Sequence, residues 1–434
     1  MIQVEDYLNN FFKGTKNPSL KAMQYFMDCY NHFEKEMNFI HIAGTNGKGS
    51  CTEIISNILI KQGYKVGKFM SPHLIRYNER IRINGKEISN EEMASLIEEL
   101  EPKIQKYHQI EKINITLFEL ETIMALLYFY RNHVDFVVLE TGLGGLYDCT
   151  NIITKPIVSV ITSIGYDHMK ILGNTLPEIA YQKAGIIKNN SNTVIFEQTP
   201  QIDDVFIKEC KVKQNQLHVI HKKDISHYHF DNEFQYFDYQ ENKGLSINLK
   251  GKKQIQNACL CIEVINILKQ HGYQVTTESI KEGLKTVIHK GRMEQLNHHP
   301  VIVFEGAHNE PAIENLQDMV NMYYSDFKRV YIISILKRKD YTAMLKLLAK
   351  DKNATFVLTS GNDEEKYSSK EELLECMKQF VEIDKIHMKN LVQAIQDAMN
   401  RNDNTISLVI GSFYTYGTVT NQIEKIKKNR EKLF

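Results

Sequence analysis

The chain has 434 residues, of which 42% are hydrophobic and 24% charged, as expected of a folded globular protein rather than a fibrous or disordered one. Its 53 basic and 53 acidic side chains balance, so net charge gives no reason to expect nucleic acid or a membrane surface as a partner. Scattered cysteines, no apolar run near the ~18 residues of a membrane span, and no signal-peptide pattern predict a cytoplasmic protein with reduced thiols.

Strand-like apolar runs alternate with helical patterns through the first half of the chain. The predicted strands are 39–43, 65–70, 136–139, 157–162 and 193–196. Segments 90–108 and 118–130 have apolar residues at the three-to-four spacing of helices. This alternation predicts an α/β fold with a mostly parallel, doubly wound sheet.

The pattern changes after residue 205. Short alternating segments at 227–239 and 245–249 predict an antiparallel appendage over 205–250, and helices are expected at 254–270 and 277–287. A second series of apolar runs then predicts a smaller Rossmann-like α/β domain, with strands at 301–305, 330–335, 355–359, 385–387 and 406–410. Gly291 and Pro300 favour a boundary near 288–300, so the predicted domains are 1–290 and 291–434.

The segment HIAGTNGKGS at 41–50 is a glycine-rich turn between a predicted strand and a predicted helix. Backbone N–H groups at Gly47 and Gly49, the Lys48 ammonium and the Ser50 hydroxyl are the groups that hold phosphate in such turns. The spacing differs from the common P-loop, because Gly44 lies three residues before Gly47 and Gly49 separates Lys48 from Ser50. The pattern favours a nucleotide site over an ordinary strand-to-helix turn.

Three further side chains could share that site. Glu140 ends a predicted strand, where a carboxylate can bind magnesium or can instead stabilise a turn. His168 follows another strand end, although a lone histidine is more often structural. Lys183 lies in a helical pattern among small and apolar residues, where a lysine is disfavoured unless it is paired or chemically modified.

A polar cluster also follows the first strand of the second domain. It contains Glu305 and the sequence GAHN at 306–309, with Arg292 shortly upstream. The cluster could be a polar loop, or it could form a composite phosphate site between the domains, since arginine binds phosphate well.

Taken together, these segments resemble the folylpolyglutamate synthase and dihydrofolate synthase family, the folate branch of the Mur ligase superfamily. The resemblance covers nearly the whole chain. The matching segments occur in the family's order: AGTNGKGS at 43–50, SPHL at 71–74, NERIRING at 78–85, FELET at 118–122, ETGLGG and DCTN within 140–151, ITSIGYDHMKILGNTLPEIAYQKAGIIK at 161–188, GRME at 291–294, GAHN at 306–309 and GSFY at 411–414.

The resemblance implies an ATP-dependent amide ligase that joins L-glutamate to the γ-carboxylate of a folate, or to dihydropteroate, through an acyl phosphate. It implies that Gly47, Lys48, Gly49 and Ser50 bind the phosphates. Ser71, Glu140 and His168 match the Mg²⁺ ligands, and Lys183 matches a lysine carbamylated by CO₂. The substrates are small molecules, and a monomer is expected.

The remaining roles follow from the same resemblance. Asn257 matches an asparagine that contacts adenine, and Arg292 matches an arginine that binds ATP phosphate. Glu305 takes the place of an aspartate that contacts ATP, and His308 matches a histidine near the reacting groups. On the pterin side the resemblance points to three residues, Phe118, Glu119 and Asp148.

Some positions depart from the family pattern. Glu305 stands where aspartate is usual, Leu146 where arginine is common, and Gln182 where glutamate precedes the lysine. These changes leave open a dihydrofolate synthase without the second activity, and a nucleotide-binding paralogue with weakened catalysis. A Mur-type ligase acting on a cell-wall precursor is a further alternative, which the NERIRING and KAGIIK segments disfavour.

Overall fold

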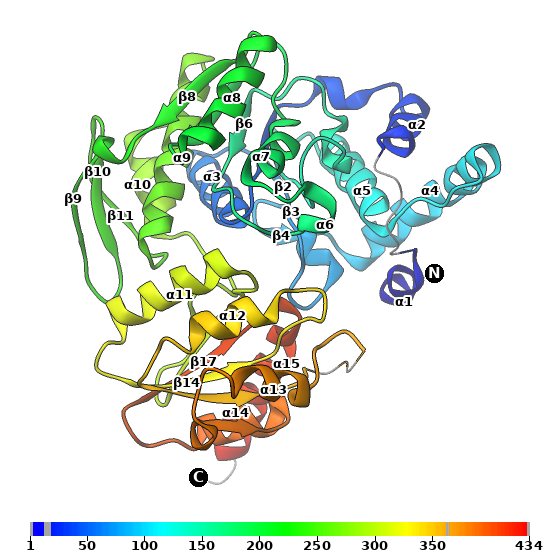
Figure 1. Cartoon of the computed structure of the whole chain (residues 1–434). Coiled ribbons are helices and arrows are strands. Elements are labelled where there is room, and N and C mark those ends of the chain that lie inside the picture. The colour runs from blue at the N-terminus through cyan, green and yellow to red at the C-terminus, as the bar shows by residue number, and fades with distance from the viewer. Residues whose placement is uncertain (1–2, 13–18, 362, 364, 432–434) are drawn as a thin grey trace. The chain divides into compact units, whose positions relative to one another are not determined.

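The computed structural model describes residues 3–12, 19–361, 363 and 365–431, which form two compact units (Figure 1). The first unit contains the described residues up to Asn248 together with Lys252–Ile288. The second contains Leu249–Gly251 and the described residues from His289 onward. The units therefore divide between residues 288 and 289, within the predicted boundary region, while 249–251 packs with the second unit rather than the first.

The first unit is built on an eight-stranded sheet with the order β4-β3-β2-β5-β1-β6-β7-β8. The strands from β2 to β8 in this order run parallel, and the hairpin β3–β4 adds an antiparallel edge. The fold class predicted from the sequence is confirmed. The strands are β1 Phe39–Ala43, β2 Val66–Phe69, β3 Ile81–Ile83, β4 Lys86–Glu87, β5 Phe136–Glu140, β6 Val158–Ile161, β7 Asn192–Phe196 and β8 Gln216–Ile220.

Helices cover both faces of this sheet because both faces of its strands are apolar. In β1, Phe39 and Ala43 pack toward one set of helices while Ile40 and Ile42 face the other way, and all four are buried. One face carries α3 Lys48–Gln62, α9 Lys252–Gln270 and α10 Thr277–Lys285. The other carries α5 Leu117–Arg131, α7 Leu176–Ala184 and α8 Pro200–Val212, and the remaining helices of the unit are α1 Val4–Asn10, α2 Lys21–Cys29, α4 Asn90–Glu111 and α6 Met169–Leu172.

Several helices begin at residues whose side chains complete a capping box. Thr116 accepts a hydrogen bond from the Glu119 N–H at the start of α5, and the Glu119 carboxylate bonds back to Thr116. Ser89 with Glu92 and Thr175 with Glu178 do the same for α4 and α7. Each box satisfies backbone N–H groups that a helix leaves without partners, so local sequence sets these starting points.

The appendage predicted for 205–250 is partly wrong. An antiparallel sheet with the order β11-β10-β9 does form, from β9 Ile225–Phe230, β10 Gln235–Tyr239 and β11 Asn242–Ile247. Residues 205–212, however, belong to α8, and β8 joins the large sheet in parallel with β7. β8 lies at the sheet edge and is half exposed, so its sequence alternates as an antiparallel strand would.

The second unit is a six-stranded sheet with the order β12-β13-β17-β14-β15-β16, in which only β12 is antiparallel to its neighbour. Its strands are β12 Glu294–Asn297, β13 Val301–Glu305, β14 Lys328–Ile333, β15 Ala354–Leu358, β16 Ile386–Met388 and β17 Thr405–Ile410. A hydrophobic core lies between one face of this sheet and the helices α11 Glu310–Tyr323, α12 Tyr341–Leu348 and α13 Lys370–Met377. The opposite face carries α14 Leu391–Met399 and α15 Tyr416–Glu431.

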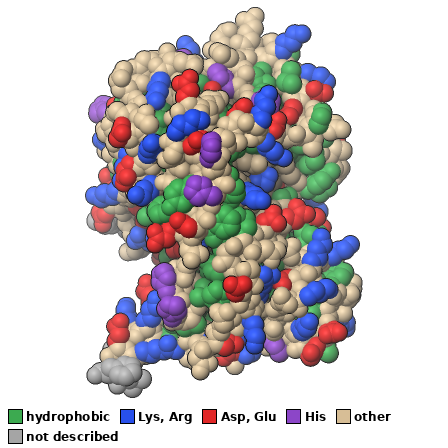
Figure 2. All heavy atoms as spheres, turned by 90° about the vertical axis from the view of Figure 1, so that its left-hand side faces the viewer, with side chains coloured by type: hydrophobic (Ala, Val, Ile, Leu, Met, Phe, Trp, Pro, Cys, Tyr) green, Lys and Arg blue, Asp and Glu red, His purple; other side chains and the backbone are tan. Residues whose placement is uncertain are grey.

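Short 3₁₀ helices connect these elements: η1 Phe33–Glu36, η2 Tyr77–Arg80, η3 Cys149–Ile152, η4 Lys222–Asp224, η5 Ile383–Lys385 and η6 Phe413–Thr415. No helix among the described residues has the length and apolar content needed to cross a membrane. Acidic and basic side chains are interspersed over the face seen in Figure 2, in keeping with the balanced composition. Large areas of a single sign are not visible among the described residues of that face.

Candidate active site

The glycine-rich turn leaves the carboxyl end of β1 and leads directly into α3, which begins at Lys48. Gly44 and Gly47 have positive φ angles of 149° and 96°, which residues other than glycine rarely adopt. Space is also lacking, because a Cβ at Gly44 would lie 1.7 Å from Thr162 Oγ1. The turn is therefore a close-packed backbone loop at a helix N-terminus, the local geometry expected for a phosphate site.

The loop that follows β6 holds this turn in place. The Thr45 N–H donates to the carbonyl of Ser163, and the Thr45 hydroxyl bonds to both backbone groups of Gly165. The Ser163 hydroxyl donates to the carbonyl of Asn46. Bonds with two loop residues, Ser163 and Gly165, fix the turn before any ligand binds, which lowers the entropy lost on binding.

Two lysines donate hydrogen bonds to one carbonyl oxygen in the turn. The Nζ of Lys48 lies 3.2 Å from the oxygen of Gly44, and the Nζ of Lys183 lies 2.7 Å from the same atom. Lys183 is buried, with 3% of its surface exposed. Burial, with a smaller contribution from the Lys48 charge, lowers the pKa of Lys183 from 10.5 to about 7. The structure therefore brings together the lysine of the glycine-rich turn and the helix lysine that the sequence singled out.

Glu140 ends β5 beside β1 in the sheet, at the same edge as the phosphate loop. Its side chain is buried, and its Oε2 lies 3.4 Å from the backbone N of Ser71, which donates to it. Two of the three predicted metal ligands are thus neighbours. Nearby, Lys68 is paired with Glu53, and the Lys68 charge lies close enough to interact with Glu140.

His168 follows the loop after β6 and adopts a positive φ of 51° immediately before α6. Its side chain is 34% exposed, and its Nε2 lies 3.7 Å from Asp167 Oδ1. No cluster of three or more His, Cys, Asp or Glu side chains is preformed for a metal within the described part of the chain. The predicted ligand set differs from such a cluster, because it also uses a serine and depends on a modified lysine.

The three residues predicted on the substrate side also have structural contacts. Glu119 caps α5, and the Phe118 ring packs against Gly142, where a Cβ would lie 2.5 Å from the ring. Asp148 is buried and accepts hydrogen bonds from the N–H groups of Leu143 and Thr150. Burial raises the pKa of Asp148, and these bonds oppose that rise. Asp148 therefore shapes the turn that follows Glu140.

Asn257 lies on α9 directly against the glycine-rich turn. Its Oδ1 would be 2.7 Å from a Cβ at Gly47, and its Nδ2 donates to Gln254. The side chain is buried at 8% exposure. The residue predicted to contact adenine is therefore next to the phosphate loop, although more than 200 residues separate them in sequence.

Residues predicted from the second unit form a cluster of their own. Arg292 donates to Glu305 Oε1 at 2.8 Å, while Glu305 Oε2 accepts from the backbone N–H of Met293 at 2.9 Å. The Arg292 guanidinium lies 4.6 Å from the centre of the Phe413 ring, in a cation–π contact. His308 also contacts this group, with its Nδ1 2.8 Å from the carbonyl of Gly306 and its ring centre 5.9 Å from that of Phe413.

The two other departures from the family pattern lie beside Lys183. The Leu146 N–H donates to the carbonyl of Gln182 at 2.8 Å, and a Cβ at Gly185 would lie 2.2 Å from Leu146 Cα. The contact that joins the turn to α7 is thus made by backbone atoms. It does not require the arginine or glutamate that is usual at these positions.

The sequence did not point to three residues that contact the predicted site residues. Thr162 packs against Gly44, Asp167 lies close enough to raise the pKa of Lys183, and the Phe413 ring supports Arg292. All three lie within segments that match the family, so their place inside these motifs was the one feature of the sequence that could have identified them. Nothing in their residue types distinguished them.

Comparison with known proteins identifies a matching protein family for each of the two units. Residues 42–265 match the Mur ligase middle domain family, and residues 288–422 match the dihydrofolate synthetase C-terminal domain family. The chain is 36% identical over 352 residues to a dihydrofolate synthase/folylpolyglutamate synthase of Bacillus subtilis, covering 79% of this chain and 81% of that protein.

Solved structures are similar over almost the whole length. A Mycobacterium tuberculosis folylpolyglutamate synthase complexed with ADP and AMPPCP superposes with a TM-score of 0.88 at 26% identity, covering 96% of this chain and 97% of that one. A complex of FPGS with AMPPCP and folate superposes with a TM-score of 0.82 at 26% identity, covering 96% and 98%.

Proposed function

Since this chain belongs to the folylpolyglutamate synthase and dihydrofolate synthase family of Mur ligases, we propose that it adds L-glutamate to the γ-carboxylate of a tetrahydrofolate. The resemblance read from the sequence motifs is confirmed by these relatives. The observation that carries the proposal is the meeting of Lys48 and Lys183 at the Gly44 carbonyl. At this carbonyl the Lys183 amine, whose pKa burial lowers to about 7, meets the Nζ of Lys48 from the glycine-rich turn.

The reaction must first activate a carboxylate, because an ionised carboxylate is a poor electrophile with a poor leaving group. A carboxylate oxygen attacks the γ-phosphorus of ATP, the bond to the bridging oxygen breaks, and ADP leaves. The glutamate amine then attacks the acyl phosphate and loses a proton, and phosphate departs with one oxygen from the substrate. The products are an amide, ADP and phosphate.

We assign phosphate binding to Gly47, Lys48, Gly49 and Ser50. The N–H groups at the start of α3 would donate to a bound phosphate, and the helix dipole adds partial positive charge there. The Lys48 ammonium would turn from the Gly44 carbonyl to the transferring phosphoryl group as negative charge develops on its oxygens.

Ser71, Glu140 and His168 are the proposed Mg²⁺ ligands. The donor set fits this ion, because Glu140 and Ser71 supply oxygen atoms and lie next to each other at the edge of the sheet. Bound Mg²⁺ would supply charge that neutralises the phosphate oxygens. Burial at the end of β5 would restrict the Glu140 side chain, so that little conformational freedom is lost when it binds the ion.

The properties of Lys183 support its carbamylation. With a pKa of about 7, a large share of the amine is neutral at physiological pH and can attack CO₂. The nitrogen bonds to the CO₂ carbon and releases a proton, which turns a cationic side chain into an anionic one. An anion there would relieve the repulsion from Lys48.

The other proposed contacts follow from the family. We assign Asn257, Arg292 and Glu305 to ATP, and His308 to the reacting groups. In this assignment Glu305 acts through Arg292, since the carboxylate holds the guanidinium in place.

On the folate side we assign Phe118, Glu119 and Asp148. A pterin ring could stack on the Phe118 ring, which is half-buried. We also propose dihydrofolate synthase activity at the same site, because the Bacillus subtilis relative is named for both reactions. Dihydrofolate synthase activity alone and a weakened paralogue are the alternatives.

Product analysis separates these possibilities. The protein is incubated with ATP, Mg²⁺ and L-glutamate plus either tetrahydrofolate or dihydropteroate, and new amides are identified by mass. A glutamate adduct of tetrahydrofolate is expected, with dihydrofolate synthesis as the second product. Dihydropteroate turnover alone would favour the first alternative, and no product with either acceptor would refute the ligase proposal.

Isotope transfer tests the intermediate. Tetrahydrofolate labelled with ¹⁸O in its γ-carboxylate should deliver one labelled oxygen to the released phosphate. Amide formation that leaves all label in the amide and water would exclude the acyl phosphate.

The setting of the reaction remains a prediction. We propose that the protein acts as a monomer in the cytoplasm on small molecules. Its balanced charge gives no reason to expect nucleic acid or a membrane surface as a partner. Light scattering of the purified chain measures whether it is a monomer, and fractionation of cells measures whether it lies in the cytoplasm.

A further inference from the structure

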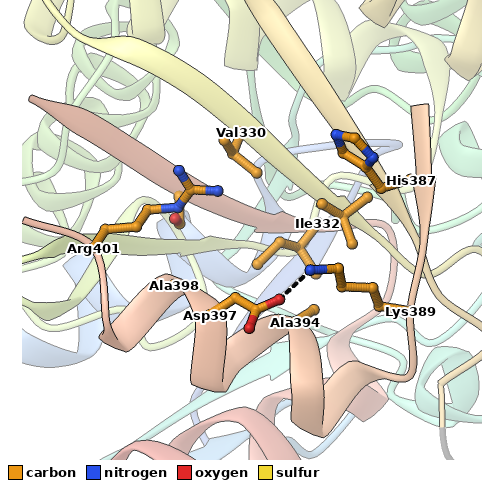
Figure 3. A pocket seen from close by; sticks show the side chains of 10 residues that line it. Val330, Ile332, His387, Lys389, Ala394, Asp397, Ala398 and Arg401 are labelled. Carbon is orange, nitrogen blue, oxygen red and sulfur yellow. Dashed lines mark hydrogen bonds and ion pairs between the residues drawn. The ribbon is translucent and has the colours of Figure 1, made fainter. Parts of the chain in front are cut away.

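Polar side chains in the two units differ in where their hydrogen bonds lead. In the second unit, Lys389 and Asp397 line a small pocket beside α14 and pair with each other (Figure 3). None of the described residues that line this pocket is assigned above to the reaction. In the first unit, a buried series of hydrogen bonds starts at a histidine of β1 and ends at Asp148, which the proposed function assigns to folate.

This series joins three side chains, which we call the His41 network: His41, Thr150 and Asp148. The Nε2 of His41 lies 2.8 Å from the Oγ1 of Thr150, and the Thr150 hydroxyl donates to the Oδ1 of Asp148 at 2.5 Å. His41 and Thr150 have no exposed surface, and Asp148 is 6% exposed. His41 lies 109 positions before Thr150 in the sequence, so tertiary structure brings them together.

His41 occupies an otherwise apolar face of β1. Phe39 and Ala43 lie two residues away on either side, face the same way and pack into hydrophobic clusters. A polar ring buried there destabilises the fold unless it is hydrogen-bonded. Thr150 provides a partner for Nε2, whereas Nδ1 has none within the described part of the chain. The bond to Thr150 therefore accounts for a histidine at this position better than core packing does.

The number of protons fixes the direction of these bonds. A hydroxyl has one proton, and Thr150 donates it to Asp148, so Thr150 accepts in its bond with His41. Burial, and to a smaller extent the charge of Lys188, lower the pKa of His41 well below its usual range, so its ring is neutral. The single ring proton is then on Nε2, and Nδ1 is a bare acceptor. This agrees with the missing partner of Nδ1.

The opposite direction would require a protonated Asp148. The Oδ2 of Asp148 accepts from the backbone N–H of Leu143 at 2.7 Å, and its Oδ1 accepts from the backbone N–H of Thr150 at 3.1 Å. Donors directed at both oxygens favour the ionised carboxylate. The Thr150 hydroxyl adds a third bond, and a hydroxyl that itself accepts a hydrogen bond donates a stronger one. The strength of this third bond therefore depends on His41.

We propose that His41 is a positioning residue, which acts through the Thr150 hydroxyl to hold Asp148 ionised and in a fixed orientation for the folate substrate. This inference rests on the proposed function, because Asp148 is assigned to folate there. His41 is fully buried, so it acts only through its neighbours. The Nε2–H of His41 orients the hydroxyl, and the hydroxyl in turn orients the carboxylate.

NMR of the full-length protein labelled with ¹⁵N-histidine tests the His41 network without any substrate. The His41→Gln variant identifies the His41 signals by their loss. In the wild type at neutral pH, the His41 ring should be neutral, with a proton on Nε2 and none on Nδ1. A proton on Nδ1, or a charged ring, would overturn the proposal.

Steady-state kinetics tests the effect on the substrate. Thr150→Val keeps a similar shape and removes the hydroxyl. It should raise the KM for tetrahydrofolate by about tenfold or more and leave the KM for ATP unchanged, because a hydrogen bond to an ionised group is lost. His41→Met should raise the same KM by about threefold or more, because the Thr150 hydroxyl then donates a weaker bond.

Two further variants serve as controls. His41→Gln has an amide N–H that can replace Nε2–H, so its KM for tetrahydrofolate should stay closer to that of the wild type than the KM of His41→Met. Thr193→Val should leave this KM unchanged, because Thr193 is a buried threonine of β7 outside the His41 network. Circular dichroism checks that each variant is folded, and Thr150→Val keeps the test valid if His41→Met is not.

A double-mutant cycle separates action through Thr150 from an independent packing effect. In the Thr150→Val background, His41→Met should cause no further rise in the KM for tetrahydrofolate. Additive effects, or an unchanged KM in the folded single variants, would overturn the proposal. If the wild type forms no folate amide at all, the proposed function fails, and the NMR measurement still decides whether the His41 network exists.

Discussion

Replacing Lys183 with methionine should stabilise the first unit near neutral pH. Lys183 is buried, and its pKa is lowered from 10.5 to about 7 chiefly by burial. Between these two values the unfolded chain binds a proton that the folded chain does not. Stability of the wild type therefore rises with pH across this window, and at its lower end the lysine destabilises the folded state.

The magnitude follows from the width of the window. At pH 7.5 about three pH units separate the solution from the pKa of the unfolded lysine, and each is worth about 1.4 kcal/mol, giving a penalty of about 4 kcal/mol. Methionine removes this penalty and loses one hydrogen bond of about 1 kcal/mol. The Gly44 carbonyl keeps its bond from Lys48, so it is not orphaned. The variant should gain about 3 kcal/mol at pH 7.5.

Urea unfolding followed by far-ultraviolet circular dichroism measures this, in buffer depleted of CO₂ so that the amine stays unmodified. At pH 9.5 only about one pH unit of the window remains, so the advantage of Lys183→Met should fall to near zero. Lys208→Met is the control, since Lys208 is exposed on α8 and should give no pH-dependent difference. A variant that is no more stable than wild type, or equally stabilised at both pH values, would refute the reasoning.

Three further predictions concern activity. Gly47→Ala forces a strained φ of 96° and sets a Cβ 2.7 Å from a side-chain oxygen on α9, so the Kd for ATP should rise at least about tenfold by calorimetry. Gly63→Ala, with a φ of 102° and open space around it, should leave ATP binding unchanged, and an equal loss in both variants would contradict a local effect. Glu305→Gln should raise the KM for ATP by about tenfold, because Arg292 loses its ionic partner; an unchanged KM would mean that this ion pair does not position the arginine. Lys183→Ala should abolish product formation and regain part of it when a short carboxylate is added, whereas full activity without additive would exclude a carbamate role.

Local sequence predicted much of the fold because the deciding interactions are short in range. The strand at 39–43, the glycine-rich turn and the helix after it were all placed correctly, since apolar spacing and glycine positions act within a few residues. The error at 216–220 has the same origin. An exposed edge strand of a parallel sheet alternates like an antiparallel strand, and only its pairing with β7 distinguishes the two.

The sequence by itself therefore indicated the two α/β units, the glycine-rich turn between β1 and α3, and the family. Tertiary structure alone decided which distant groups meet. Lys183 reaches the Gly44 carbonyl across 139 positions, and Asn257 packs against Gly47 although more than 200 residues separate them. The physical reason is that sheet order and strand register set these distances, and both arise from the burial of apolar surface by the whole chain rather than from any local pattern.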